Sequence, residues 1–185
     1  GLLAIGSSTL FNGDFARAKE TSIESLLVAR QIKDDILEAT GLRVLGLAEN
    51  GLGNKDRAML VLEESLAIYR RIGDKLGIAY LLRNMGIVPL QLGDFERAAT
   101  LCTESLAISH GLKDKWSMAW AMQELATAAA LGEKDMVKAA RLFGAVEVLR
   151  EQTASVTPAS EQSLYDQGTD AARSGLGEKA FLDEW

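Results

Sequence analysis

One stretch of sequence occurs three times along the chain, and the copies lie 40 residues apart. It reads ESLLVARQIKD at Glu24–Asp34, ESLAIYRRIGD at Glu64–Asp74 and ESLAISHGLKD at Glu104–Asp114. A fixed period of this size indicates a repeat architecture, in which one supersecondary unit is stacked on copies of itself. The recurrence therefore constrains the fold more than any single motif does.

A glycine followed by a short polar residue marks a second repeated feature, at 13–14, 53–54 and 93–94. Glycine adopts the left-handed conformation that ends one helix, and Asp14, Asn54 or Asp94 can then cap the free N–H groups of the next. Leu131–Gly132 repeats the pattern one residue early. These sites predict tight junctions between helices.

Between the repeated stretch and the junction lies a helical pattern, in which Ala39, Leu42, Leu45 and Gly46 have counterparts 40 and 80 residues later. Their spacing places them on one helical face. The small residue at positions 46, 86 and 126 lets a neighbouring helix approach closely. Each unit is predicted to be an antiparallel helix pair, with a first helix of roughly 17 residues and a second helix ending at the aspartate of the repeated stretch. Asp34, Asp74 and Asp114 then cap the following first helix.

Applied to the whole chain, this register predicts an all-α, right-handed superhelical solenoid of about ten helices. Repeats occupy residues 1–152, in units of about 1–33, 34–73, 74–113 and 114–152, and the fourth second helix covers 134–152. The first helix is expected to be truncated, so the chain is interpreted as a piece of a longer protein. Residues 153–185 are predicted to be a C-terminal cap, with a helix from Pro158 to Ser174, ended by Gly175 and Gly177, and another at 178–185.

Pro89 lies inside a predicted first helix. Proline removes one donor and clashes with the carbonyl four residues back, so a kink near Met85–Pro89 is expected. Two interpretations stay open: a tolerated bend, or a groove widened for a ligand.

Composition excludes several classes of function. The net charge of −6 argues against binding to nucleic acid, which depends on clustered Lys and Arg. With Cys102 as the single cysteine, no intrachain disulfide or cysteine metal cluster can form, and a reducing, cytoplasmic location is expected. The sequence contains no run of eighteen apolar residues, so no membrane span is predicted. The apolar residues at the start of the sequence lack the basic region of a signal peptide.

The residues also carry a resemblance to a known family. Helix pairs with A-x-x-L-x-x-[LM]-G, then L-G-[DN]-x-x-x-A and E-S-L-A resemble tetratricopeptide repeats, which are usually about 34 residues long. The longer form, extended into R-x-x-G-D, resembles repeats of kinesin light chains and of bacterial signal-transduction ATPases. The segment Ala139–Arg150, the Pro-led helix and the sequence GEKAF are similar to the C-terminal region of MalT/LuxR-type or AfsR-like bacterial regulators, and some bacterial Ser/Thr kinases and adenylate cyclases carry a similar region. Their nucleotide-binding and helix-turn-helix domains have no counterpart in this sequence, so neither activity is implied for it.

No catalytic constellation, metal site or cofactor motif is found in the sequence. The single histidine, His110, excludes any multi-histidine metal site and is expected to be solvated at a helix end. Cys102 lies on the apolar pattern and is expected to be a buried structural thiol. The Gly51–Gly53 segment is interpreted as a helix-end turn, because a phosphate cradle needs a third glycine and a preceding strand. We therefore expect no enzymatic activity.

The sequence feature that indicates a binding function is geometric, because the first helices of stacked pairs line the concave side of a solenoid. Counted from positions 46, 86 and 126, the inward residues are Thr40, Tyr80 and Trp120; Arg43, Arg83 and Gln123; Val44, Asn84 and Glu124; and Leu47, Ile87 and Thr127. Aromatic residues and arginines dominate binding hot spots, and an arginine pair can select a carboxylate. The alternative is that Arg43 and Arg83 pair with neighbouring Glu side chains and that Trp120 is core.

These features predict a non-catalytic scaffold that binds a peptide, possibly acidic, or a small effector in its concave groove. The resemblance implies that the scaffold is part of a bacterial regulatory protein. The alternative is a self-association module, in which repeat ends stack or the tail is exchanged between copies. Neither nucleic acid nor membrane is expected as a partner of this segment.

Overall fold

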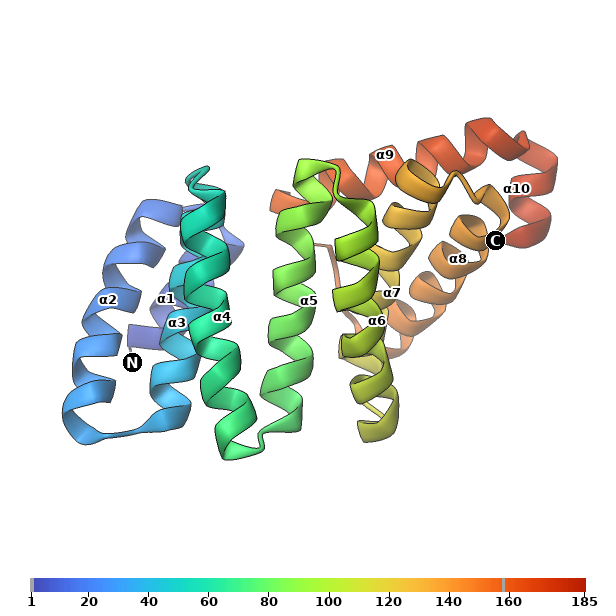
Figure 1. Cartoon of the computed structure of the whole chain (residues 1–185). Helices are drawn as coiled ribbons and strands as arrows, with labels where there is room; N and C mark the ends of the chain where they lie inside the picture. Colours follow the sequence, from blue (N-terminus) through green and yellow to red (C-terminus); the bar gives the residue numbers. More distant parts are fainter. Residues whose placement is uncertain (1, 158) are drawn as a thin grey trace. The chain divides into compact units, whose positions relative to one another are not determined.

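The computed structural model describes residues 2–157 and 159–185, and in that part of the chain it contains ten α-helices, one π-helical turn and no strand. The all-α prediction is therefore confirmed. The chain forms two compact units, Gly1–Asn84 and Met85–Trp185, which we call the N-terminal and C-terminal units. Figure 1 shows the order of the helices along the chain.

The N-terminal unit consists of helices that pack in sequence, α1 on α2, α2 on α3 and α3 on α4. Helix α1 also contacts α3. The helices are α1 (Leu2–Phe11), α2 (Phe15–Ile32), α3 (Asp35–Gly51), α4 (Lys55–Ile72) and the first part of α5 (Lys75–Leu92). This order of consecutive packed helices is the repeat-like arrangement that the recurrence predicted.

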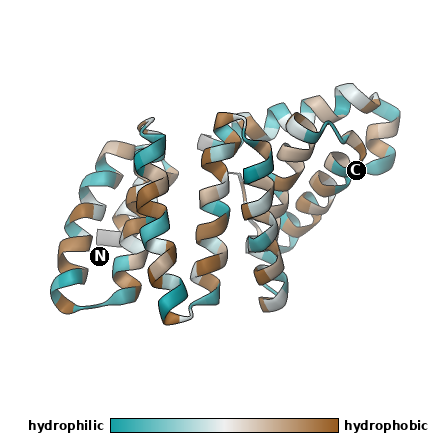
Figure 2. Cartoon of the chain, in the orientation of Figure 1, coloured by the Kyte–Doolittle hydropathy of each residue, from teal (hydrophilic) through white to brown (hydrophobic). Residues whose placement is uncertain are grey.

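The C-terminal unit continues the same order, with α6 on α7 and α7 on α8, and its last two helices pack back on the preceding ones. Its elements are the end of α5, α6 (Phe95–Leu112), α7 (Lys115–Ala128), the π-helix η1 (Ala129–Glu133), α8 (Met136–Thr153), α9 (Ala159–Leu176) and α10 (Glu178–Glu184). Apolar residues are interrupted by polar ones along the helices (Figure 2). Within the described residues, no helix is both long and apolar enough to cross a membrane.

The first three glycine junctions form as predicted, because Gly13, Gly53 and Gly93 have φ angles of 78°, 86° and 79°. The fourth junction, predicted at Leu131–Gly132, does not: Gly132 lies inside η1, and the left-handed residue is Lys134, with φ of 55°. Asp14 and Asp94 cap the next helix by accepting hydrogen bonds from the N–H groups of Arg17 and Arg97. The prediction for the cap at Asn54 is wrong. Asn54 makes no side-chain capping bond, because its amide instead donates to the Glu49 carboxylate at 2.7 Å.

The second helices end two residues before the predicted aspartates, at Ile32, Ile72 and Leu112. The intervening residue is left-handed in each case, with φ of 58° at Lys33, 73° at Gly73 and 57° at Lys113. The aspartates cap the following first helices as predicted: Asp34 accepts from Leu37, Asp74 from Gly77 and Asp114 from Trp116 and Ser117.

The small residues of the first helices lie against side chains of their partner helices. A Cβ at Gly46 would lie 2.6 Å from Leu62, and one at Gly86 would lie 2.5 Å from the sulfur of Cys102. The predicted close approach is thus confirmed at both positions. Cys102 is fully buried, as predicted for a structural thiol.

The fourth junction departs from the 40-residue period by one residue. The capping residues are Asp14, Asn54, Asp94 and Asp135, so the last interval is 41 residues (135 − 94). The π-helix η1 absorbs the extra residue, since a π turn contains one residue more than an α turn. As a result Gly132 lies under the ring of Phe95, in the way that Gly51 lies under Phe15.

The tail forms two helices as predicted, with one different boundary. Helix α9 continues through Gly175 to Leu176. The glycine lets Met136 approach closely, since a Cβ on Gly175 would lie 2.7 Å from the Met136 side chain. Gly177, with φ of 78°, starts α10. The predicted helix start at Pro158 lies outside the described residues. The chain runs through Pro89 as one continuous helix, α5.

Candidate binding surface

Three of the predicted groove residues lie on α3 and remain partly accessible. Thr40, Arg43 and Leu47 are partly buried, and their spacing of three and four residues places them on one face of the helix. Val44, beside them, is fully buried and belongs to the core. The N-terminal unit therefore exposes a hydroxyl, a cation and an apolar side chain along α3.

Two further predicted residues lie on the part of α5 that belongs to the same unit. Tyr80 and Arg83 are partly buried, whereas Asn84 is only 6% exposed. Ile87, in the C-terminal unit, is 4% exposed. We call Thr40, Arg43, Leu47, Tyr80 and Arg83 the open row.

Tyr69 of α4 holds one member of this row, Thr40, in position. Its hydroxyl lies 3.0 Å from Thr40 Oγ1, and its ring lies against Gly77 of α5, where a Cβ would be 2.4 Å from the ring. Thr40 also donates to the carbonyl of Ile36. This hydroxyl is therefore held in position by its own protein.

The arginines of the N-terminal unit differ in whether an acidic side chain binds them. Arg71 makes two bonds to Asp35, of 2.8 and 2.9 Å, and these bonds hold the pKa of that carboxyl below its usual range. Arg30 joins Glu38 and Glu64. Arg43, in contrast, makes no hydrogen bond or ion pair within the described part of the chain. The alternative that Arg43 pairs with a neighbouring glutamate is thus not what the structure shows.

The equivalent residues on α7 are not accessible. Trp120, Gln123 and Thr127 are 6%, 1% and 1% exposed, and Glu124 is 2% exposed. Helix α9 packs on α7, and a Cβ on Gly168 of α9 would lie 3.2 Å from Thr127. The groove prediction therefore needs correction in the last repeat, because the tail of the chain itself covers that face.

A polar cluster that sequence reasoning missed holds this tail. Arg150 donates to Gln123 and, at 3.1 Å, to Glu147, and its guanidinium lies 4.9 Å from the centre of the Tyr165 ring. Tyr165 donates to Glu147 at 2.8 Å, and burial together with this bond raises its pKa. We call Glu147, Arg150 and Tyr165 the clamp.

A sequence signal for the clamp exists once the 41-residue interval is known. Glu147 then aligns with Leu106 and Leu66, and Arg150 aligns with Ser109 and Tyr69. Two charged residues thus replace uncharged ones in the last repeat only. A strict 40-residue register hides this, because it pairs Arg150 with His110 and Glu147 with Ala107.

Within the described residues, no group of three or more His, Cys, Asp or Glu side chains could hold a metal ion. His110 is exposed near the end of α6. An open pocket between α6, η1 and α8 contains Asp94, Glu96 and Lys138, but Lys138 is paired with Glu133 at 2.8 Å.

The fold and these surfaces define an all-α protein of helical repeat-like architecture. The sequence matches no protein-family model and no curated protein. Among solved structures, the chain is similar to BtubC (BKLC) from P. vanneervenii, with a TM-score of 0.73 and 19% identity over 99% of this chain and 73% of that one. At this identity the likeness concerns the fold alone.

Proposed function

We propose that the chain is a non-catalytic scaffold that binds a peptide or small effector through the open row of its N-terminal unit. The observation that carries this proposal is Arg43, a partly buried guanidinium without an acidic partner in the described chain. A cation that is partly removed from water is stabilised by a carboxylate, which can take a bidentate geometry.

The other members of the row support the same kind of ligand. Tyr80 and Arg83 are partly buried and lie three residues apart on α5, and aromatic residues and arginines are enriched at binding hot spots. Leu47 adds an apolar contact. The row therefore fits a carboxylate-bearing peptide with an apolar side chain next to its charge.

We further propose that the units are long tetratricopeptide repeats and that the chain belongs to a bacterial regulator of the MalT/LuxR or AfsR type, acting in the cytoplasm. The motifs around Gly46 and Gly86, the capped junctions and the order of packed helices support the repeat assignment. The tail motif GEKAF supports the regulator assignment.

Calorimetry with a set of acidic peptides tests the open row. The Arg43→Ala/Arg83→Ala variant should bind at least about tenfold more weakly than wild type, since each charge-assisted bond contributes about 1.5–3 kcal/mol. Arg17→Ala/Lys179→Ala is the matched control, because both residues are exposed and the net charge changes equally. Equal affinity of wild type and the Arg43→Ala/Arg83→Ala variant would remove the site assignment.

Self-association is a second candidate, and one observation favours it. Val28 on α2 is 45% exposed and Ile32 is 59% exposed, whereas Ile68, the equivalent of Val28 on α4, is 9% exposed. The apolar helix face that is covered on α4 is therefore exposed to solvent on α2. Light scattering at increasing concentration should show a dimer or larger species that Val28→Asp/Ile32→Asp abolishes. A monomer at every concentration would dispose of this candidate.

A further inference from the structure

The hydroxyl of Thr40 can only accept a hydrogen bond from a ligand, because its single hydrogen is already used. A hydroxyl carries one hydrogen and two lone pairs. Thr40 Oγ1 lies 2.8 Å from the carbonyl oxygen of Ile36, so Thr40 is the donor in that pair. In the contact of 3.0 Å with the Tyr69 hydroxyl, Tyr69 must therefore be the donor. One lone pair of Thr40 stays available.

The donor Tyr69 is packed in one position. Its side chain is 4% exposed, and its ring lies against Gly77 of α5. The residues 40 positions before and after it are Ala29 and Ser109, and neither carries a phenol hydroxyl. The fixed direction of the Tyr69–Thr40 bond is thus particular to this unit of the repeat.

Arg43 and Leu47 follow Thr40 on the same face of α3, and each offers different chemistry. All three side chains are partly buried. The guanidinium of Arg43 is a donor only and binds a carboxylate with favourable geometry, whereas Leu47 offers an apolar surface. We call these three residues the α3 stripe. In chain order, the stripe presents an acceptor, a cation and an apolar side chain.

The spacing of the α3 stripe matches that of an extended peptide. At a rise of 1.5 Å per residue, Arg43 and Leu47 lie about 6 Å apart along the helix axis. Side chains two residues apart in an extended segment project from the same side, about 6.6 Å from each other. Thr40 lies about 4.5 Å from Arg43 in the other direction, which is a distance of one to two residues in such a segment.

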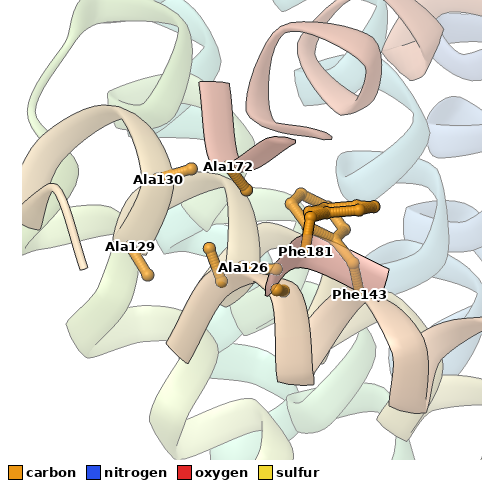
Figure 3. Close-up of a cluster of buried hydrophobic side chains, with 8 residues drawn as sticks. Ala126, Ala129, Ala130, Phe143, Ala172 and Phe181 are labelled. Atoms are coloured by element: carbon orange, nitrogen blue, oxygen red, sulfur yellow. The ribbon is translucent and has the colours of Figure 1, made fainter. Parts of the chain in front are cut away.

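Within the described residues of α7, the positions equivalent to the α3 stripe are covered. These positions hold Trp120, Gln123 and Thr127. Each is at most 6% exposed, and α9 packs on α7. Helix α9 is anchored by Ala172, which is fully buried in a cluster with Phe143 and Phe181. Figure 3 shows Ala172 beside Ala130, with Phe181 next to Phe143. The α3 stripe thus has no accessible counterpart on α7.

We propose that the α3 stripe binds an extended peptide segment in which an acidic residue and an apolar residue are two positions apart. The carboxylate binds Arg43 and the apolar side chain contacts Leu47. A backbone N–H on the other side of the acidic residue donates to Thr40, which accepts such a donor and cannot donate to a second carboxylate. This inference rests on the proposed function and names the pattern of its ligand.

Nuclear magnetic resonance titration of the isotope-labelled full chain with short peptides tests the spacing. The probes are Ala-Ala-Glu-Ala-Leu-Ala and its reverse, both blocked at their ends so that the side-chain carboxylate is the only anion. The better of the two should bind at least about fivefold more tightly than Ala-Ala-Glu-Leu-Ala-Ala, blocked in the same way, because only residues two apart project from one side. The shifts should centre on the α3 stripe.

The outcomes of this titration separate the inference from the proposed function. Equal affinity for the two spacings would overturn the inference and leave carboxylate binding by Arg43 in place. Absence of binding by every acidic peptide would overturn the proposed function together with the inference.

A backbone ester in the better peptide tests the role of Thr40, because it removes a single N–H donor. At one amide beside the glutamate, the ester should weaken binding to wild type at least about threefold, as expected for the loss of one neutral hydrogen bond. It should have no effect on Thr40→Val, which keeps the side-chain shape but has no acceptor. Thr40→Ser, which keeps the hydroxyl, should behave like wild type. The same ester effect in wild type and Thr40→Val would overturn the role of Thr40.

Discussion

At the scale of single residues, Glu49 shows how a buried charge is accommodated between helices. It is fully buried, yet its carboxylate receives Lys19 at 3.0 Å, Arg57 at 2.9 Å and Asn54 at 2.7 Å. Burial raises the pKa of Glu49, but hydrogen bonds from Asn54 and Lys19 and the charges of Lys19 and Arg57 outweigh it and hold the pKa below its usual value. The carboxylate thereby joins α2, α3 and α4.

Glu49→Gln should destabilise the protein by about 1.5–3 kcal/mol at pH 7, the usual contribution of hydrogen bonds to a charged group. Because the pKa is lower in the folded protein, this stabilisation is present above the unfolded-state pKa of about 4.3. It is lost as the pH falls through the folded-state pKa. Urea unfolding at pH 7 and pH 3 measures both effects, and the same difference between wild type and variant at the two pH values would contradict this explanation.

At the scale of elements, contact between paired helices depends on the absence of a side chain at Gly46. A Cβ there would lie 2.6 Å from Leu62, and this distance requires a shift of one helix. Gly111, in α6, has no atom within 4 Å of an added Cβ. The two glycines therefore form a matched pair.

Gly46→Ala should lower the free energy of unfolding by about 1–3 kcal/mol through overpacking. Gly111→Ala should raise it by about 0.5–1 kcal/mol, because alanine favours the helix and meets no neighbour. Thermal or urea denaturation measures both. A similar effect of the two substitutions would show that close approach at Gly46 does not hold the pair together.

Most of the elements could be predicted because their determinants are local and repeated. The 40-residue recurrence was sufficient to place the second helices within two residues and to assign the caps at Asp34, Asp74 and Asp114. The missing cap at Asn54 could not be predicted, since the amide of Asn54 donates to Glu49 of the preceding helix. The docking of α9 on α7 occurs once and depends on tertiary contacts, so no recurrence indicated it and Gln123 and Thr127 were assigned to an open groove.

At the scale of the whole molecule, the division between Asn84 and Met85 implies that each unit has its own core. Leu62 and Phe143 are both fully buried, one in each unit. In repeat-like folds, stability is approximately a sum of the stabilities of units and of contacts between neighbours.

Leu62→Ala and Phe143→Ala should therefore weaken different parts of the chain, each by about 2–5 kcal/mol. Hydrogen exchange should show lost protection mainly in residues 2–84 for Leu62→Ala and mainly in residues 85–185 for Phe143→Ala. Uniform loss along the chain in both variants would mean that the units unfold as one.

The central claim is that positions equivalent by repeat are open to a ligand in the N-terminal unit and occupied by the chain itself in the C-terminal unit. Cysteine labelling at two such positions, Leu47→Cys and Thr127→Cys, tests it most directly, because the native Cys102 is buried. Under native conditions the Leu47→Cys thiol should react with a maleimide at least about tenfold faster than the Thr127→Cys thiol. Equal rates at the two positions would contradict the account.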